Sequence, residues 1–239
     1  MTISVDDTLT FAFPDGFQAV KWDASKTYRA LLNTWQFACA CEQCPSRHCS
    51  PKHRDASCEK GANCRVRSRD GLKAVDLVCL REAELYLLEV KDFNRSHQSK
   101  VQDLNDDSVL SHYVVSIAKK FRDTLFSLWV GGLVAWDSNE KKFAEQCRRS
   151  SRWIYFVFHC ERPDVPYQSG FFHRGKAVSS ETVREAISKY VGGALSANLK
   201  VVDCAEMSAH PQIVPWKATF RRGDLIDQLR SQSGIEKIR

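Results

Sequence analysis

The sequence predicts a single α/β domain in which helices flank a mixed β-sheet and a cysteine-rich insertion interrupts the fold. Residues 72–80 and 85–93 are two apolar runs around a polar tetrapeptide, a pattern typical of a β-hairpin. Amphipathic helical patterns lie on both sides of this hairpin. Six of the ten cysteines fall between residues 39 and 64. The 239-residue chain shows no internal repeat, which suits one domain.

Composition and charge limit the classes of function. The formal net charge of +6 is compatible with a polyanionic partner. No apolar run is long enough to cross a bilayer, and the start, MTISVDDTLTF, lacks the basic and apolar regions of a secretory signal. We therefore expect a cytoplasmic protein that has no membrane partner.

The N-terminal part is expected to form two strands and a helix. Residues 8–13 and 17–22 flank a Pro-Asp-Gly turn and predict a hairpin. Apolar residues then recur at helical spacing over 26–38. Ser25 or Asp23 is the expected N-cap of this helix.

The cysteine-rich segment 39–64 predicts a structural zinc site. Cys41-x₂-Cys44 matches the first half of a tetrahedral site, and Cys49 and Cys58 are the preferred second half. Other candidates for ligands in the segment are Cys39, His48, His53 and Cys64. Free cysteines, an iron–sulfur cluster and disulfides are the alternatives, the last requiring an oxidising compartment. The segment has few large apolar residues, so metal binding would supply its folding free energy.

The central hairpin places charged residues on an otherwise apolar face. A two- or four-residue loop pairs residues whose numbers sum to 165, which puts Asp76 opposite Glu89. Glu89 and Lys91 then project side by side. Facing carboxylates repel, and burial increases the cost of charging both, so a divalent cation between them would remove the conflict. The alternative is a structural cluster of ion pairs.

Asp76 followed by Glu89-Val90-Lys91 resembles the signature of the PD-(D/E)xK nuclease superfamily. The resemblance implies a restriction-endonuclease-like αβββαβ core. It also implies that Asp76, Glu89 and the main-chain carbonyl of Val90 bind Mg²⁺ or Mn²⁺. Lys91 would position or deprotonate the attacking water.

The chain departs from that signature in two places. Val75 stands where the family's namesake proline would be. Many members also carry an acid on the helix before the hairpin, whereas the helix expected at 26–38 has none; Glu42 and Glu59 are the nearest candidates.

The remaining chain is expected to complete the sheet and its helical cover. A helix over 108–129 is expected to end at Gly131-Gly132. Lys119, Lys120 and Arg122 lie off its apolar stripe and are candidates for contacts with a DNA backbone. A central strand over 153–160 follows. Its His159 and Cys160 are adjacent and point to opposite faces, which excludes a Cys–His nucleophile made by these two. A helix ending at Gly192 and a strand over 199–204 come last.

The resemblance implies a metal-dependent nuclease that hydrolyses phosphodiester bonds, with DNA as the expected partner. It also suggests a role in a bacterial defence or restriction system beside an ATPase or sensor subunit. The alternative function is a non-catalytic, zinc-containing nucleic-acid-binding or adaptor protein with a nuclease-like fold.

Overall fold

The computed structural model describes residues 1–5, 9–34, 72–92, 107–161 and 180–220. The predicted zinc segment 39–64, with all its candidate ligands, lies outside these residues, as do Glu42 and Glu59.

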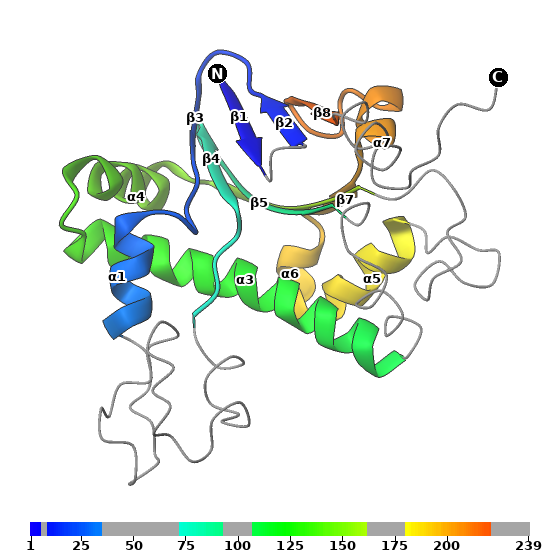
Figure 1. Ribbon diagram of the computed structural model, residues 1–239, viewed down its shortest axis with the longest axis horizontal. Helices are drawn as coiled ribbons and strands as arrows, with labels where there is room; N and C mark the ends of the chain where they lie inside the picture. The colour runs from blue at the N-terminus through cyan, green and yellow to red at the C-terminus, as the bar shows by residue number, and fades with distance from the viewer. Residues whose placement is uncertain (6–8, 35–71, 93–106, 162–179, 221–239) are drawn as a thin grey trace, which may run out of the picture.

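A mixed five-stranded sheet forms the middle of the molecule (Figure 1). Its strands, in spatial order, are β3 (Phe17–Val20), β4 (Leu77–Arg81), β5 (Glu84–Asp92), β6 (Trp153–Glu161) and β7 (Leu199–Val202). The first three are antiparallel neighbours, whereas β5, β6 and β7 run parallel. The long connections between the parallel strands contain helices, as parallel pairing requires.

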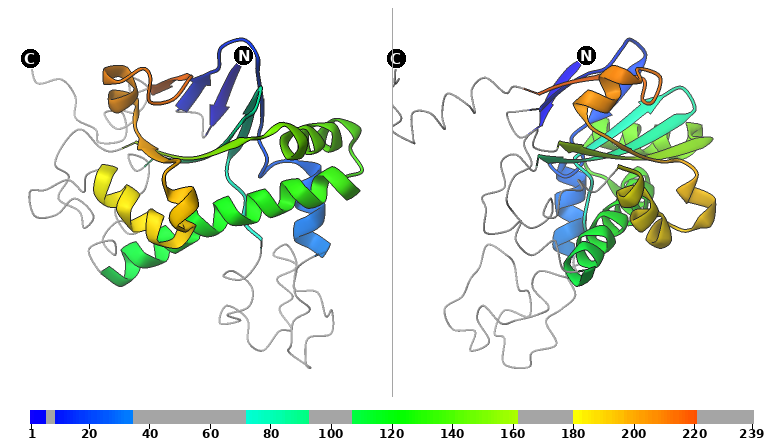
Figure 2. Two further views of the ribbon diagram at one scale, coloured as in Figure 1. Left: turned by 180° about the vertical axis from the view of Figure 1, so that it is seen from behind. Right: turned by 90° about the vertical axis from the view of Figure 1, so that its right-hand side faces the viewer.

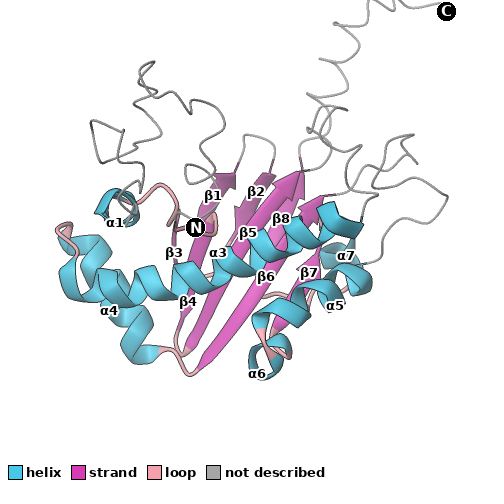
Figure 3. Cartoon of the chain, turned by 90° about the horizontal axis from the view of Figure 1, so that it is seen from below, coloured by secondary structure: helices cyan, strands magenta, loops and turns pink. Residues whose placement is uncertain are grey.

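Helices cover one face of this sheet (Figure 3). The long helix α3 (Asp107–Val134) crosses beneath the strands, with α1 (Lys26–Thr34) and α4 (Ser138–Ser150) near its C-terminal end and α5 (Ser180–Val191) near its start. The short helix α6 (Gly193–Ser196) follows α5. The expected α/β class, with a mixed sheet flanked by helices, is confirmed.

A second, smaller sheet lies over the opposite face (Figure 2). It consists of β1 (Thr2–Val5), β2 (Leu9–Ala12) and β8 (Lys217–Phe220), with β2 in the middle and both pairings antiparallel. Helix α7 (Cys204–Ala209) lies on the same side. The elements β1, α4, α6, α7 and β8 were not predicted from the sequence.

The alternation of side chains along β5 separates two apolar cores. Leu85 and Leu87 pack on the α3 side with Phe156 and Phe158 of β6. The intervening residues of the two strands pack toward the second sheet, where the buried side chains include Tyr86, Leu88, Val90, Val157, Phe11 and Trp216. The face of a residue on β5 or β6 therefore decides which core it enters.

The register predicted for the central hairpin is confirmed. Leu77 pairs with Leu88 and Arg81 with Glu84, so paired numbers sum to 165 and the turn is Glu82-Ala83. The first strand begins at Leu77, not Leu72. The backbone just before it is bound to α3 instead: the N–H groups of Lys73 and Val75 donate to side chains of Asp123 and Thr124, both at 3.0 Å.

The N-terminal hairpin prediction is wrong. β2 and β3 flank the Pro-Asp-Gly turn, but they belong to different sheets: β2 pairs with β1 and β8, and β3 pairs with β4. Gly16 has φ 86°, a conformation that favours glycine, so the turn signal was read correctly as a change of direction. It carries no information about which strand pairs with which.

The prediction that Gly131-Gly132 ends the long helix is also wrong, because α3 continues to Val134. Both glycines are sites of close approach. A Cβ at Gly131 would lie 3.0 Å from a methyl group of Thr27, and one at Gly132 would lie 3.3 Å from the backbone N of Glu145 on α4. At Gly192 (φ 95°), by contrast, α5 stops as predicted.

None of the helices within the described residues combines the length and the apolar character needed to cross a membrane.

Candidate functional site

The three residues of the predicted nuclease motif lie together at the end of the hairpin. Asp76 directly precedes β4, and its Oδ2 accepts a hydrogen bond of 2.7 Å from the backbone N–H of Val90. The ladder ends at the pair Leu77–Leu88, so the next position brings Asp76 to Glu89. This placement follows from the register that the two-residue turn imposes.

Glu89 is completely buried and is held by two lysines on the α3 side of the sheet. Lys91 Nζ lies 2.6 Å from Glu89 Oε1. Lys120 Nζ, which comes from α3, donates to Oε1 and Oε2 at 2.7 and 2.8 Å. Burial, followed by the charge of Asp76, raises the pKa of Glu89, and the two lysines oppose this shift.

Lys91 also touches the main-chain group expected to bind metal, because its Nζ donates to the carbonyl oxygen of Val90 at 3.0 Å. Two ammonium groups therefore lie against the oxygen atoms of Glu89 and Val90 that the resemblance assigns to a cation.

Asp23 is a further acid of this site, which was not predicted from the sequence. Burial raises its pKa, with the charge of Asp76 as the next cause, so the two carboxyl groups repel. Ser25, not Asp23, caps α1, since Ser25 Oγ accepts the N–H of Tyr28 at 3.0 Å. The only sequence signal that could have placed Asp23 in the site with Asp76 is its position just before α1, the helix that precedes the hairpin.

The three residues predicted to contact DNA have different positions. Lys120 points inward to Glu89. Arg122 is 73% exposed and pairs with the buried Asp123 at 3.0 Å. Lys119 is half-buried and lies close enough to Lys73 to lower its pKa, although burial is the larger cause. They do not form one outward-facing cationic surface.

A second group of polar side chains lies on the opposite face of the same strands. His159 Nε2 is 2.7 Å from Glu161 Oε1 and 3.9 Å from Cys204 Sγ. One ligand atom from each residue lies within 4.8 Å of the others, the only such trio of His, Cys, Asp or Glu found in the described ranges. His159 is completely buried, and its ring packs edge to face against Phe11 of the second sheet, with 5.1 Å between the ring centroids.

The separation of His159 from Cys160 by face is confirmed, because Cys160 packs in the core beside α3. The cysteine that does reach His159 is Cys204, 45 residues later and at the start of α7. Burial and Glu161 strongly raise the pKa of the Cys204 thiol. Burial alone would raise the pKa of Glu161, but hydrogen bonds from His159 and Cys204 hold it below its ordinary value.

Comparison with known proteins gives one partial similarity. The chain is 30% identical over 169 residues to a cysteine–tRNA ligase of Neisseria meningitidis serogroup A, an alignment that covers 69% of this chain and 22% of that protein. The chain therefore matches less than a quarter of its relative's length. No protein-family model matches the chain, and no solved structure matches it significantly.

Proposed function

We propose that this protein is a metal-dependent nuclease that hydrolyses phosphodiester bonds, with DNA as its main substrate and Asp76, Glu89 and Lys91 as its catalytic residues. The observation that supports this most is the buried Glu89 carboxylate, placed by register beside Asp76 and surrounded by positive charge. The meander β3–β4–β5, followed by α3 and the parallel β6, is compatible with a restriction-endonuclease-like core.

The residues present suit a hard divalent cation. Two carboxylates and one carbonyl supply only oxygen atoms, which Mg²⁺ and Mn²⁺ prefer. Lys91 and Lys120 already bring ammonium groups to the same oxygen atoms, which indicates that this position favours positive charge. Lys120 holds both oxygen atoms of Glu89, so it would compete with a cation for them.

The chain's own residues can orient a phosphodiester and a water molecule there. Lys91 Nζ lies against Glu89 and the carbonyl of Val90, so its ammonium charge is placed beside the proposed cation, where the phosphodiester and the attacking water would meet it. Lys120, once released from Glu89, would add positive charge near the phosphate. Mg²⁺ or Mn²⁺ bound there would polarise the phosphate and lower the pKa of a bound water.

The test is digestion of plasmid, linear and single-stranded DNA with Mg²⁺, Mn²⁺ or EDTA. Wild type should cut only with a divalent ion, and Glu89→Gln should reduce cutting to background. Glu84→Gln is the matched control, because it makes the same change on the same strand at a half-buried ion pair with Arg81, away from the motif. A Glu89→Gln protein that cuts at the wild-type rate excludes Glu89 from catalysis.

One observation favours the second candidate, a non-catalytic nucleic-acid-binding or adaptor protein. Lys91 and Lys120 already neutralise Glu89, so the cluster is complete as a set of structural ion pairs. This protein would bind nucleic acid without cutting it, whichever divalent ion is present. The relative's name refers to a tRNA ligase, so tRNA belongs among the substrates tested.

Two parts of the proposal concern residues and partners outside the described structure. Structural zinc bound within residues 39–64 would stabilise that segment, and an ATPase or sensor subunit would direct cleavage in a defence system. Elemental analysis and co-purification from the native host test these two points separately.

A further inference from the structure

We propose that His159, Glu161 and Cys204 form a zinc-binding site on the face of the central sheet opposite Glu89. This site is independent of the proposed nuclease function and of the predicted cysteine-rich zinc segment. Its three donor atoms are an imidazole nitrogen, a carboxylate oxygen and a thiol sulfur, a mixture that suits Zn²⁺ better than Mg²⁺.

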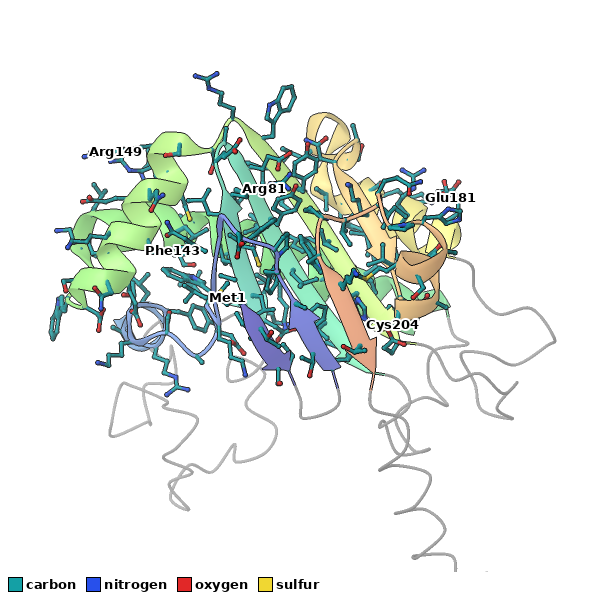
Figure 4. The ribbon with its side chains drawn as sticks, turned by 90° about the horizontal axis from the view of Figure 1, so that it is seen from above. Met1, Arg81, Phe143, Arg149, Glu181 and Cys204 are labelled. Atoms are coloured by element: carbon teal, nitrogen blue, oxygen red, sulfur yellow. The ribbon has the colours of Figure 1, made fainter. Side chains whose placement is uncertain are left out.

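The fold brings the three residues together from two places in the chain. His159 and Glu161 are two apart on β6, so both project toward the second sheet. Cys204 is the first residue of α7, which begins directly after β7, the parallel neighbour of β6. Figure 4 shows Cys204 at the end of the sheet opposite Arg81, at the junction with α7.

The observed distances need only small adjustments to accept zinc. Zn–S and Zn–N bonds of about 2.3 and 2.0 Å at a tetrahedral angle place the two donor atoms roughly 3.5 Å apart. Cys204 Sγ and His159 Nε2 are 3.9 Å apart. The contact of 2.7 Å between His159 Nε2 and Glu161 Oε1 would open to roughly 3.3 Å, because Zn–N and Zn–O bonds of about 2.0 and 2.1 Å meet at the same angle.

The hydrogen bonding around the trio agrees with a bound cation. Glu161 Oε1 accepts the backbone N–H of Cys204 at 2.7 Å, and hydrogen bonds of this kind orient the carboxylates that bind metals. Zinc at Nε2 would replace a single hydrogen bond by a coordinate bond and leave the surrounding packing intact.

A catalytic Cys–His–Glu arrangement does not fit the same geometry. Such a triad uses both imidazole nitrogens, one toward the thiol and one toward the carboxylate. Here the same Nε2 faces both Glu161 and Cys204. A cation bound to the three donor atoms would stabilise the thiolate form of Cys204.

The consequence for the fold is a cross-link between β6 and α7. The three protein ligands leave a fourth position of a tetrahedral zinc for water. The cross-link fixes the end of β6 against the start of α7.

The first experiment measures zinc per chain by elemental analysis of the full-length protein and of three single variants. Cys204→Ser and His159→Gln should each contain about one zinc less than wild type. Cys160→Ser is the matched control, because Cys160 is also buried and lies on β6, but on the other face. Equal zinc in wild type and Cys204→Ser overturns the site.

The second experiment uses only the wild-type protein, so it does not depend on how the variants fold. Cysteine alkylation is followed residue by residue by peptide mass spectrometry, with and without a zinc chelator. The half-buried Cys204 should react at least several-fold faster after chelation, whereas the buried Cys79 and Cys147 should not change. The site is overturned if the chelator leaves the alkylation rate of Cys204 unchanged. It is also overturned if the rates of Cys79 and Cys147 rise by the same factor as that of Cys204.

Discussion

The two faces of the β5–β6 pair carry different chemistry at the same end of the sheet. Toward α3, the buried carboxylate Glu89 is surrounded by ammonium groups and other carboxylates. Toward the second sheet, Val90 of β5 pairs with His159 of β6, whose ring meets a carboxylate and a thiol. Adjacent strand residues point to opposite faces, so the α3 face offers only hard oxygen donors, whereas the other face offers nitrogen, oxygen and sulfur. The two faces would therefore select different cations.

The largest expected effect compares the Glu89 cluster with the half-buried ion pair of Glu84 on the same strand. Glu89→Ala leaves Lys91 and Lys120 without their shared carboxylate and should cost about 2–4 kcal/mol of unfolding free energy. This is somewhat less than for a completely buried pair, because both lysine side chains are partly exposed. Urea denaturation in EDTA measures it. Glu84→Ala, at the other end of β5, is the control and should cost much less; equal losses would contradict a special role for the Glu89 cluster.

The next effect tests whether that face binds hard cations. Mg²⁺ at 100 times its dissociation constant should stabilise wild type by about 2.7 kcal/mol. Asp76→Asn should abolish this gain and raise the melting temperature in EDTA, because it removes repulsion and the amide oxygen can still accept the Val90 N–H. Cys204→Ser should keep the Mg²⁺ response. If Asp76→Asn has a lower melting temperature than wild type in EDTA, and Mg²⁺ does not change the melting temperature of wild type, the cluster is a set of structural ion pairs.

A smaller effect is the pH dependence of the metal-free protein. The pKa of Glu89 is raised above its ordinary 4.5, so the folded state holds the proton at pH values where the unfolded state has lost it. The contribution of Glu89 to stability therefore falls as pH rises from about 4.5 toward the folded-state pKa. Asp76→Asn should narrow this window, because it removes one cause of the shift. Chemical denaturation from pH 4 to 8 checks it, and an unchanged profile in the variant would argue against repulsion between the two groups.

The smallest expected effect concerns the competition between Lys120 and a cation. Lys120→Met removes the amine that holds both oxygen atoms of Glu89 while keeping the apolar stem. The variant should bind Mn²⁺ several-fold more tightly in calorimetry. Lys119→Met is the control on the same helix. Weaker Mn²⁺ binding in Lys120→Met would mean that Lys120 supports the metal site instead of competing with it.

Local rules predicted the part of the site that the hairpin builds. A two-residue turn fixes the register, and the register brings Asp76 to Glu89 and aligns Glu89 with Lys91. Asp23, just before α1, and Lys120, on α3, reach the same place. Residue spacing along a helix or a strand does not indicate how the helix packs on the sheet, so these two residues could not be predicted in this way. Lys120 was predicted to contact a DNA backbone, whereas in the structure its ammonium group pairs with Glu89.

The opposite face shows the same limit. Alternation along β6 correctly separated His159 from Cys160, but no local pattern points from His159 to Cys204. Their contact depends on the parallel pairing of β6 with β7, which is a property of the whole topology. The Pro-Asp-Gly turn failed as a pairing signal for a related reason, because a reversal of the chain can lead into another sheet.

The glycine pair in α3 has a consequence for how this helix forms. Each glycine costs about 1 kcal/mol relative to alanine in a helix interior, so residues 131–134 would fray in an isolated peptide. They are helical here because Thr27, Trp22 and the backbone of α4 pack directly against them. The last turn of α3 should therefore become protected from hydrogen exchange only together with α1 and α4, as one cooperative unit that assembles when the three helices dock.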